Sequence, residues 1–270
     1  MSSISQSACQ KKMPDFTLPT FQALLSAFLT EGFSFTPLSS YTEVSGKKTV
    51  ILRHDVDRLP GNSLATAQLE HETGIRGSYY FRIVPESYDE TIIREIYRLG
   101  HEIGYHYEDL ALAGGDADKA YTSFCRNLDK IRKLVPVTTI CMHGSPLSRY
   151  DSRDIWKKYD YRKLGLTAEP YFDIDFNKTF YLTDTGRRWD GHKVSIRDKA
   201  IAGSPVTNPD FLGRSYHTTS GIIGAVEKGG FPNQVMITIH PQRWTSNIFL
   251  WSKEFISQNL KNQVKRFMVK

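Results

Sequence analysis

Short apolar segments that end abruptly in polar residues alternate with amphipathic segments along most of this chain. KTVILRHDVD is typical of a buried parallel strand that carries polar groups at its carboxyl end. Further strands are predicted in GSYYFRI, HEIGYH, VTTICMHG, LTAEPYF, TFYLTDT and VMITIHP, and helices at 21–33, 62–73, 90–100, 117–134, 152–159 and 247–268. This alternation predicts an α/β fold with a mostly parallel sheet, either doubly wound or closed into a barrel.

The length and the absence of an internal linker favour one main domain. We expect a flexible N-terminus over residues 1–15 and a single domain over 16–270. The N-terminal residues contain no apolar core of a signal peptide, and no later stretch is long and apolar enough for a membrane span. A cytoplasmic protein is therefore expected, and three widely spaced cysteines agree with a reducing compartment.

The basic residues are distributed rather than clustered. The formal net charge is +6, but no block of five or six Lys and Arg is present, which argues against a nucleic-acid-binding tail. A weak attraction to anionic substrates, including phosphorylated ones, is what the charge implies.

Four predicted strands end in residues that are suited to metal or proton chemistry. Asp55 and Asp57 lie in RHDVD, His106 ends HEIGYH, His143 follows VTTICM, and His240 follows VMITI. Because the carboxyl ends of parallel strands meet on one face of an α/β fold, we expect these side chains to form one site.

Two aspartates and several imidazoles can supply both a metal ligand set and a general base. One carboxylate can hold a divalent cation together with imidazoles, while the other accepts a proton from the attacking water. On ligand type alone Zn, Co, Ni, Fe and Mn suit such a site about equally well, and one zinc ion is our expectation.

The motifs HDVD, GHEIGYH and the late IH resemble those of the polysaccharide deacetylase (NodB-homology, carbohydrate esterase family 4) superfamily. The resemblance covers roughly Lys48 to Trp244, and it implies a distorted (β/α)7 barrel, here with an extra N-terminal helix. It also implies that Asp55 is the general base, Asp57 and His106 are metal ligands, and His240 is the general acid.

The chain departs from that family at the second metal histidine. Leu110 stands four residues after His106, where the family has its second His, and Leu cannot bind a metal. The third ligand is then His143, Glu108 or Asp109. We favour His143 because the end of a strand is a rigid platform. The family's third motif, which contains Arg-x-Pro, is not evident near MHGSP, so the sequence shows no residue that orients the base.

Two Arg–Trp pairs are candidates for substrate binding. Arg187 and Trp189 lie in TDTGRRWDG, and Arg243 and Trp244 follow His240. Trp can stack on a sugar ring and Arg can clamp a carboxylate or phosphate. For the first pair, a surface hairpin with a half-buried Trp is the alternative.

The predicted function is metal-dependent hydrolysis of an N-acetyl or other acyl amide group on a sugar. A cytoplasmic enzyme would meet a nucleotide-linked or lipid-linked precursor of a surface polysaccharide, so an acetylated and phosphorylated sugar is the expected partner. The alternatives are a metal-free glycan-binding pseudoenzyme, for which Leu110 argues, and a metal-dependent sugar O-deacetylase or amidohydrolase. The sequence determines neither the sugar nor the oligomeric state.

Overall fold

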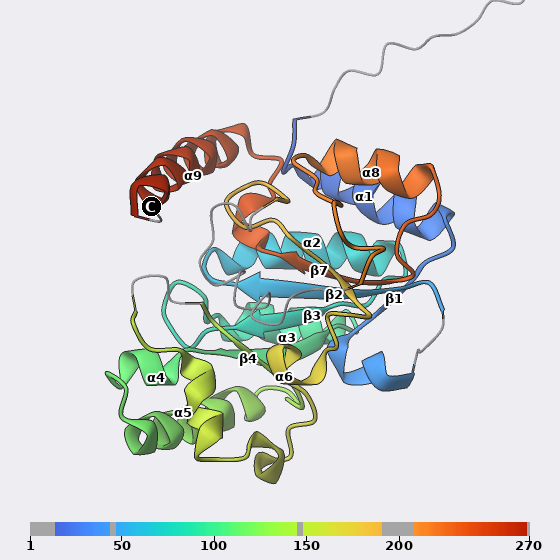
Figure 1. Ribbon diagram of the computed structural model, residues 1–270. Helices are drawn as coiled ribbons and strands as arrows, with labels where there is room; N and C mark the ends of the chain where they lie inside the picture. Colours follow the sequence, from blue (N-terminus) through green and yellow to red (C-terminus); the bar gives the residue numbers. More distant parts are fainter. Residues whose placement is uncertain (1–13, 44–46, 145–147, 191–207, 269–270) are drawn as a thin grey trace, which may run out of the picture.

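The computed structural model describes residues 14–43, 47–144, 148–190 and 208–268, which form an α/β fold around one parallel sheet (Figure 1). The strands are β1 (Ser34–Thr36), β2 (Thr49–Val56), β3 (Ser78–Phe81), β4 (Glu102–Tyr107), β5 (Ile140–Met142), β6 (Phe180–Thr183) and β7 (Gln234–Ile239). Nearly all of the N-terminus that we expected to be flexible, residues 1–15, lies outside the described residues.

The strands follow the order of a barrel with one gap. Neighbours along the sheet are β5-β4-β3-β2-β7-β6, and every pair is parallel. This is the cyclic order of a (β/α) barrel, in which β5 and β6 would meet. β1 pairs with the start of β2, on the edge that β3 occupies further along. The predicted α/β barrel class is confirmed, although β5 and β6 are not paired within the described ranges.

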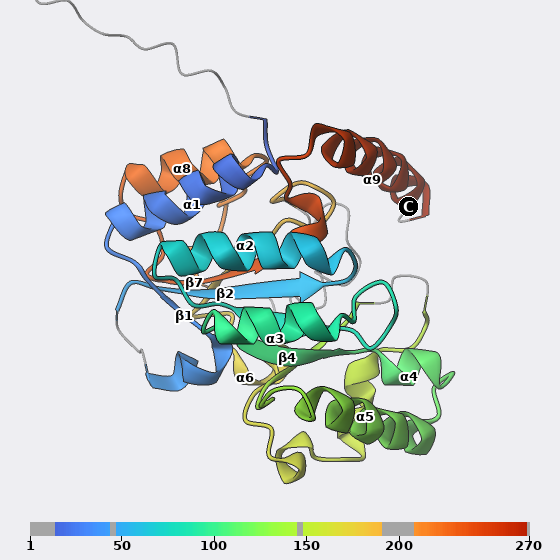
Figure 2. The ribbon, with the colours of Figure 1, turned by 180° about the vertical axis from the view of Figure 1, so that it is seen from behind.

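Helices surround the sheet, and the last of them, at the C-terminal end, stands apart from it (Figures 1 and 2). They are α1 (Leu18–Thr30), α2 (Pro60–Glu72), α3 (Glu90–Arg98), α4 (Asp109–Leu112), α5 (Ala117–Arg132), α6 (Pro170–Asp173), α8 (Thr219–Glu227) and α9 (Ile248–Met268), with 3₁₀ turns η1 (Leu38–Glu43), η2 (Ser152–Lys157), η3 (Tyr161–Leu164) and η5 (Pro241–Arg243). Among the described helices, none has both the length and the apolar composition needed to cross a bilayer.

Two predicted elements differ from the structure. The helix predicted at 152–159 is the 3₁₀ turn η2, which begins after the capping residue Asp151. The strand predicted at 166–172 is reduced to a single bridge between Ala168 and Thr139. The reason is Pro170, which cannot donate to a strand ladder and begins α6, while the Glu169 side chain accepts the Tyr171 N–H.

The two-residue period of β2 separates two environments. Val50 and Leu52 pack into the apolar layer under α1 and α8, whereas Ile51 packs with Tyr80 and Met236 on the opposite, inner face of the curled sheet. Side chains two residues apart share a face. Arg53 and Asp55 therefore continue the inner row that starts at Ile51, and this row leads to the carboxyl edge of the sheet.

Gly104 of β4 is required by this inner packing. A Cβ at this position would lie 2.3 Å from the Tyr80 ring and 2.9 Å from the Thr139 carbonyl oxygen, and Tyr80 is fixed because its hydroxyl hydrogen-bonds Thr139. We expect Gly104→Ala to lower the free energy of unfolding by about 1–3 kcal/mol. Urea unfolding measures this loss. The matched control is Gly224→Ala in α8, which has open space around it and should be neutral or stabilising.

Candidate metal and catalytic site

The predicted strand-end residues lie together at the carboxyl edge of the sheet. Asp57 follows β2, His106 is in β4, His143 follows β5 and His240 follows β7. Asp57 Oδ1 is 3.6 Å from His106 Nε2 and 3.1 Å from His143 Nδ1. Its other oxygen, Oδ2, is 4.0 Å from His240 Nε2. Asp57 is therefore at the centre of this group.

Asp57, His106 and His143 have the donor set of a divalent metal site. Their ligand atoms all lie within 4.8 Å of one another. His106 Nδ1 is 2.9 Å from the Cys141 carbonyl oxygen, so Nδ1 carries the proton and Nε2 is turned toward Asp57 and His143. Asp57 Oδ1 is buried, yet it accepts no hydrogen bond from the described residues. An unpaired carboxylate oxygen beside two imidazoles fits a divalent cation.

Asp57 is held in its ionised form and in one orientation. Burial by itself would raise the pKa of Asp57, but the neighbouring His143 and His106 hold it well below its usual range. Gln242, which the sequence analysis did not single out, donates from Nε2 to Asp57 Oδ2 at 3.0 Å. This hydrogen bond leaves Oδ1 facing the imidazoles.

A second group of possible ligands, Asp55 with His106 and Cys141, fits a metal less well. Both oxygens of Asp55 already accept hydrogen bonds from Arg53. Burial raises the pKa of the Cys141 thiol well above its usual value, which disfavours the thiolate. Only the Asp57 group has a carboxylate oxygen, Oδ1, that accepts no hydrogen bond from the described residues.

The structure distinguishes the three candidates for the third ligand. His143 Nδ1 lies 3.2 Å from His106 Nε2, within the site. Glu108 is instead ion-paired with Arg82, and its Oε2 is 3.9 Å from His143 Nε2. Asp109 is buried with Tyr105 and Asn127, and Leu110 belongs to the apolar core. The geometry therefore favours His143.

Asp55 lies next to the metal group and is paired with Arg53. Arg53 Nε and Nη2 donate to the two Asp55 oxygens at 2.7 and 2.6 Å, and both residues are buried. Burial raises the pKa of Asp55, but the Arg53 charge outweighs it and the pKa is lowered. Sequence reasoning missed Arg53. The signal was its position two residues before Asp55, on the same face of the strand.

His240 is held by a buried carboxylate. Asp184, just after β6, accepts hydrogen bonds at 2.5 Å from His240 Nδ1, at 2.6 Å from Arg243 Nη1 and at 2.7 Å from Trp244 Nε1. This arrangement places the proton of the neutral imidazole on Nδ1 and directs Nε2 toward Asp57. Asp184 lies in the TDTGRRWDG stretch of the sequence but was not predicted as a site residue.

Three of the four predicted substrate-binding residues have structural contacts instead. Arg243 and Trp244 are buried and bind Asp184. Trp189 is buried, donates to Thr219 Oγ1 and stacks against Phe16. Because these indole faces are covered by protein, we correct the prediction that the two tryptophans stack on a sugar ring. Together with neighbouring aromatic residues, the two tryptophans form the core under the site. Their positions in the sequence do not distinguish a core tryptophan from one that stacks on a substrate.

Arg187, the fourth of these residues, lies between aromatic rings. Its guanidinium is 5.0 Å from the Phe16 ring centroid, 4.8 Å from that of Trp251 and 5.5 Å from that of Phe255. Burial lowers its pKa to about 10. Its Nη atoms are buried and have no hydrogen-bond partner among the described residues. A role in binding an anionic substrate group stays a prediction.

Asp184 gives the site a measurable dependence on pH. Burial opposes its ionisation, but Arg243 and His240 together lower its pKa to about 2 from 3.8. A carboxyl group whose pKa is lower in the folded than in the unfolded protein stabilises the fold, here by about 2 kcal/mol, at pH values above its unfolded-state pKa. This contribution is lost as the pH falls from about 4 to about 2. We expect the stability difference between the wild type and Asp184→Asn to shrink over this range, as measured by urea unfolding. A difference that stays constant with pH would contradict the assignment.

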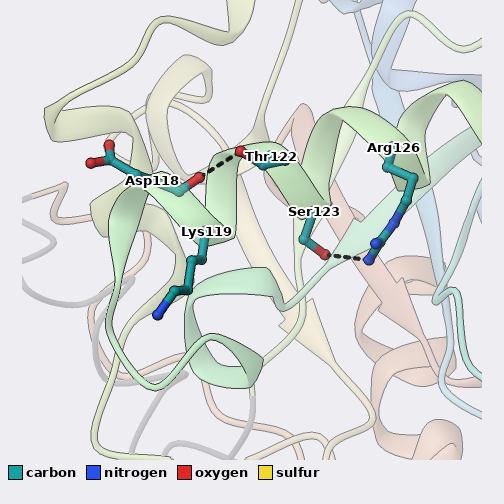
Figure 3. A pocket seen from close by; sticks show the side chains of 5 residues that line it. All are labelled: Asp118, Lys119, Thr122, Ser123 and Arg126. Carbon is teal, nitrogen blue, oxygen red and sulfur yellow. Dashed lines mark hydrogen bonds between the residues drawn. The ribbon is translucent and has the colours of Figure 1, made fainter.

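The other polar features lie away from this site. His54 Nε2 is 2.8 Å from Oε1 of Glu70 in α2, so this side chain points away from Asp55. An open hollow on the surface of α5 is lined by Asp118, Lys119, Thr122, Ser123 and Arg126 (Figure 3). In Figure 3 these are ordinary surface residues of one helix, and none belongs to the strand-end group.

Comparisons with known proteins give only distant similarities. No protein-family model matches the chain, and no curated protein matches it. Among solved structures, the chain is similar to a CE4 esterase from Streptococcus mutans, with 13% identity, coverage of 88% of this chain and 89% of that chain, and a TM-score of 0.45. It is also similar to a family 4 carbohydrate esterase from Bacillus anthracis, with 12% identity, coverage of 88% and 85%, and a TM-score of 0.39.

A third similar structure is a CE4 family pseudoenzyme from Bacillus anthracis. It shares 13% identity over 82% of this chain and 63% of that chain, with a TM-score of 0.41.

Proposed function

We propose that the protein is a metal-dependent carbohydrate deacetylase that hydrolyses an N-acetyl or related acyl amide group on a sugar. The observation that carries this proposal is the position of Asp57. Its Oδ1 faces the imidazoles of His106 and His143, and its Oδ2 faces His240. Hydrolysis of an amide needs an activated water, a base to deprotonate it and an acid for the leaving amine, and this cluster has a residue for each role.

The proposed metal ligands are Asp57, His106 and His143, which are three protein ligands and leave a position for substrate or water. A divalent ion held there would supply positive charge that polarises the acyl carbonyl and acidifies a water molecule. Zinc is the ion that we propose, although Co, Ni, Fe and Mn accept the same oxygen and nitrogen donors.

Asp55 is the proposed general base and Arg53 its positioning residue. The two hydrogen bonds from Arg53 fix the plane of the carboxylate and keep it ionised, while Asp55 Oδ2 stays 3.7 Å from His106 Nε2. The carboxylate therefore lies beside the metal group, where it can take the proton of the attacking water.

His240 is the proposed general acid. Its Nδ1 hydrogen bond to Asp184 leaves Nε2 to carry the proton that goes to the leaving nitrogen. The Asp184 carboxylate stabilises the imidazolium form, and Arg243 and Trp244 hold that carboxylate in turn.

We propose as substrate an acetylated sugar on a phosphorylated carrier, which is a nucleotide-linked or lipid-linked precursor of a surface polysaccharide. The formal net charge of +6 supports an anionic substrate. The guanidinium of Arg187 is a second supporting observation, because it lies three residues after Asp184 and neither Nη atom has a hydrogen-bond partner among the described residues.

Acetate release tests the proposal. The metal-loaded protein is incubated with N-acetylated nucleotide sugars, N-acetylated lipid-linked sugars, neutral N-acetylated oligosaccharides and O-acetylated sugars, and acetate is measured enzymatically. We expect release from the N-acetylated phosphorylated substrates. Release from O-acetylated sugars alone would replace the proposal with O-deacetylation, and no release from any of them by protein that binds metal would contradict it.

A further inference from the structure

Helix α9 is amphipathic, but its polar side faces the protein. Glu254 and Gln258 are 8% and 7% exposed, whereas Phe249, Ile256 and Leu260 are 74%, 60% and 60% exposed. The three apolar residues are seven and four positions apart, so they share one face of the helix. A helix that packs on a globular protein normally buries such a face. Here the face is left to solvent.

The polar side of α9 is attached to the catalytic site. Glu254 forms an ion pair with Arg58, which directly follows Asp57. Asn262 donates to the carbonyl oxygen of Gly186, and Trp251 packs on Arg187. Figure 1 shows α9 beyond the carboxyl end of β2. The exposed face therefore lies on a helix that borders the site.

The charge around α9 favours an anionic partner. From Ile248 to the end of the chain the sequence contains Lys253, Lys261, Lys265, Arg266 and Lys270 but only one acidic residue, Glu254. Glu254 is neutralised by Arg58, and Lys253 and Lys261 are exposed. A second copy of this helix would bring cationic residues together. The surface of an anionic bilayer complements both the lysines and the apolar face.

We propose that α9 is a membrane-surface helix, which inserts Phe249, Ile256 and Leu260 among the lipids of an anionic bilayer and holds the catalytic site at that surface. This inference deepens the proposed function and rests on it for one part only, the substrate. Of the two precursor classes, it selects the sugar carried on a membrane lipid, because such a substrate is presented at the surface that α9 binds.

Vesicle sedimentation tests the membrane contact without any assay of activity. The full chain is mixed with vesicles of phosphatidylcholine alone or with about 30% phosphatidylglycerol. We expect binding to the anionic vesicles, and a decrease of at least about tenfold in a Phe249→Ser, Ile256→Ser, Leu260→Ser variant. The matched control replaces three exposed apolar residues elsewhere, as Leu112→Ser, Phe172→Ser and Leu212→Ser, and should bind like the wild type.

The role of the lysines is tested in the same assay. Lys253→Gln with Lys261→Gln should weaken binding by about fivefold for each lysine. The matched control is Lys119→Gln with Lys157→Gln, two exposed lysines on other elements. Circular dichroism checks that each variant is folded, which we expect because every replaced side chain is exposed.

Several results would overturn the proposal. These are no binding to the anionic vesicles, binding that does not depend on phosphatidylglycerol, and equal binding by the α9 triple variant. Light scattering that shows a dimer broken by the same triple variant would assign the face to a second copy instead.

The substrate is tested separately by acetate release. The triple variant should lose activity on a lipid-linked sugar in vesicles by about tenfold while keeping its activity on a soluble N-acetylated sugar. Vesicle binding without acetate release from any substrate would disprove the proposed function and leave the membrane contact standing. Equal activity of the triple variant on the lipid-linked substrate would disprove the selection of substrate.

Discussion

Purified Asp57→Ala protein is expected to contain no bound divalent ion and to hydrolyse its substrate about a thousandfold more slowly than the wild type. The physical reason is that Asp57 supplies the only carboxylate among the three ligands that we propose, and its Oδ1 is the unpaired oxygen between two imidazoles. Loss of the ion removes the charge that stabilises the transition state, which is a contribution of several kcal/mol. Elemental analysis of both proteins, after loading with zinc and dialysis, measures the metal content.

Two further variants give this experiment its controls. Glu108→Gln removes a nearby carboxylate that is already paired with Arg82, and we expect it to keep its metal. His143→Ala removes the proposed third ligand, and we expect metal affinity to decrease by at least about tenfold. The reverse pattern, with metal lost from Glu108→Gln and kept by His143→Ala, would make Glu108 the ligand. Absence of metal from the wild type would point to a binding protein.

The positions of the main site residues could be predicted from sequence because they depend on a general rule. Apolar strands that end in Asp or His indicate parallel strands, and the carboxyl ends of such strands meet. This rule predicts that Asp57, His106, His143 and His240 lie together. The residues that orient them obey no such rule. Arg53 donates two hydrogen bonds to Asp55 within β2, and Gln242 donates one to Asp57, which depends on how η5 lies beside the end of β2.

The predictions that failed did so for local physical reasons. The apolar segment 166–172 resembles a strand, but Pro170 removes a backbone donor and begins a helix. Trp189 and Trp244 were expected at the substrate because aromatic residues near a polar cluster are often binding residues. Whether an indole is covered depends on tertiary packing. Phe16, far away in the sequence, covers both rings.

The Asp55→Asn variant is expected to lower kcat by about a hundredfold or more while keeping its metal. An amide cannot accept the proton of the attacking water, whereas the ligands Asp57, His106 and His143 remain unchanged. The same change also affects the fold, because Arg53 is left as a buried cation without its carboxylate. We expect a loss of about 3 kcal/mol in the free energy of unfolding. Activity must therefore be measured well below the melting temperature.

A double variant separates the loss of the base from the loss of stability. Arg53→Met combined with Asp55→Asn removes the buried charge as well as the base, so we expect part of the stability to return. Activity should stay at the level of the single variant, because the proton acceptor is still missing. If activity returned together with stability, the low kcat of Asp55→Asn would be a consequence of partial unfolding, and Asp55 would be a structural partner of Arg53 rather than the base.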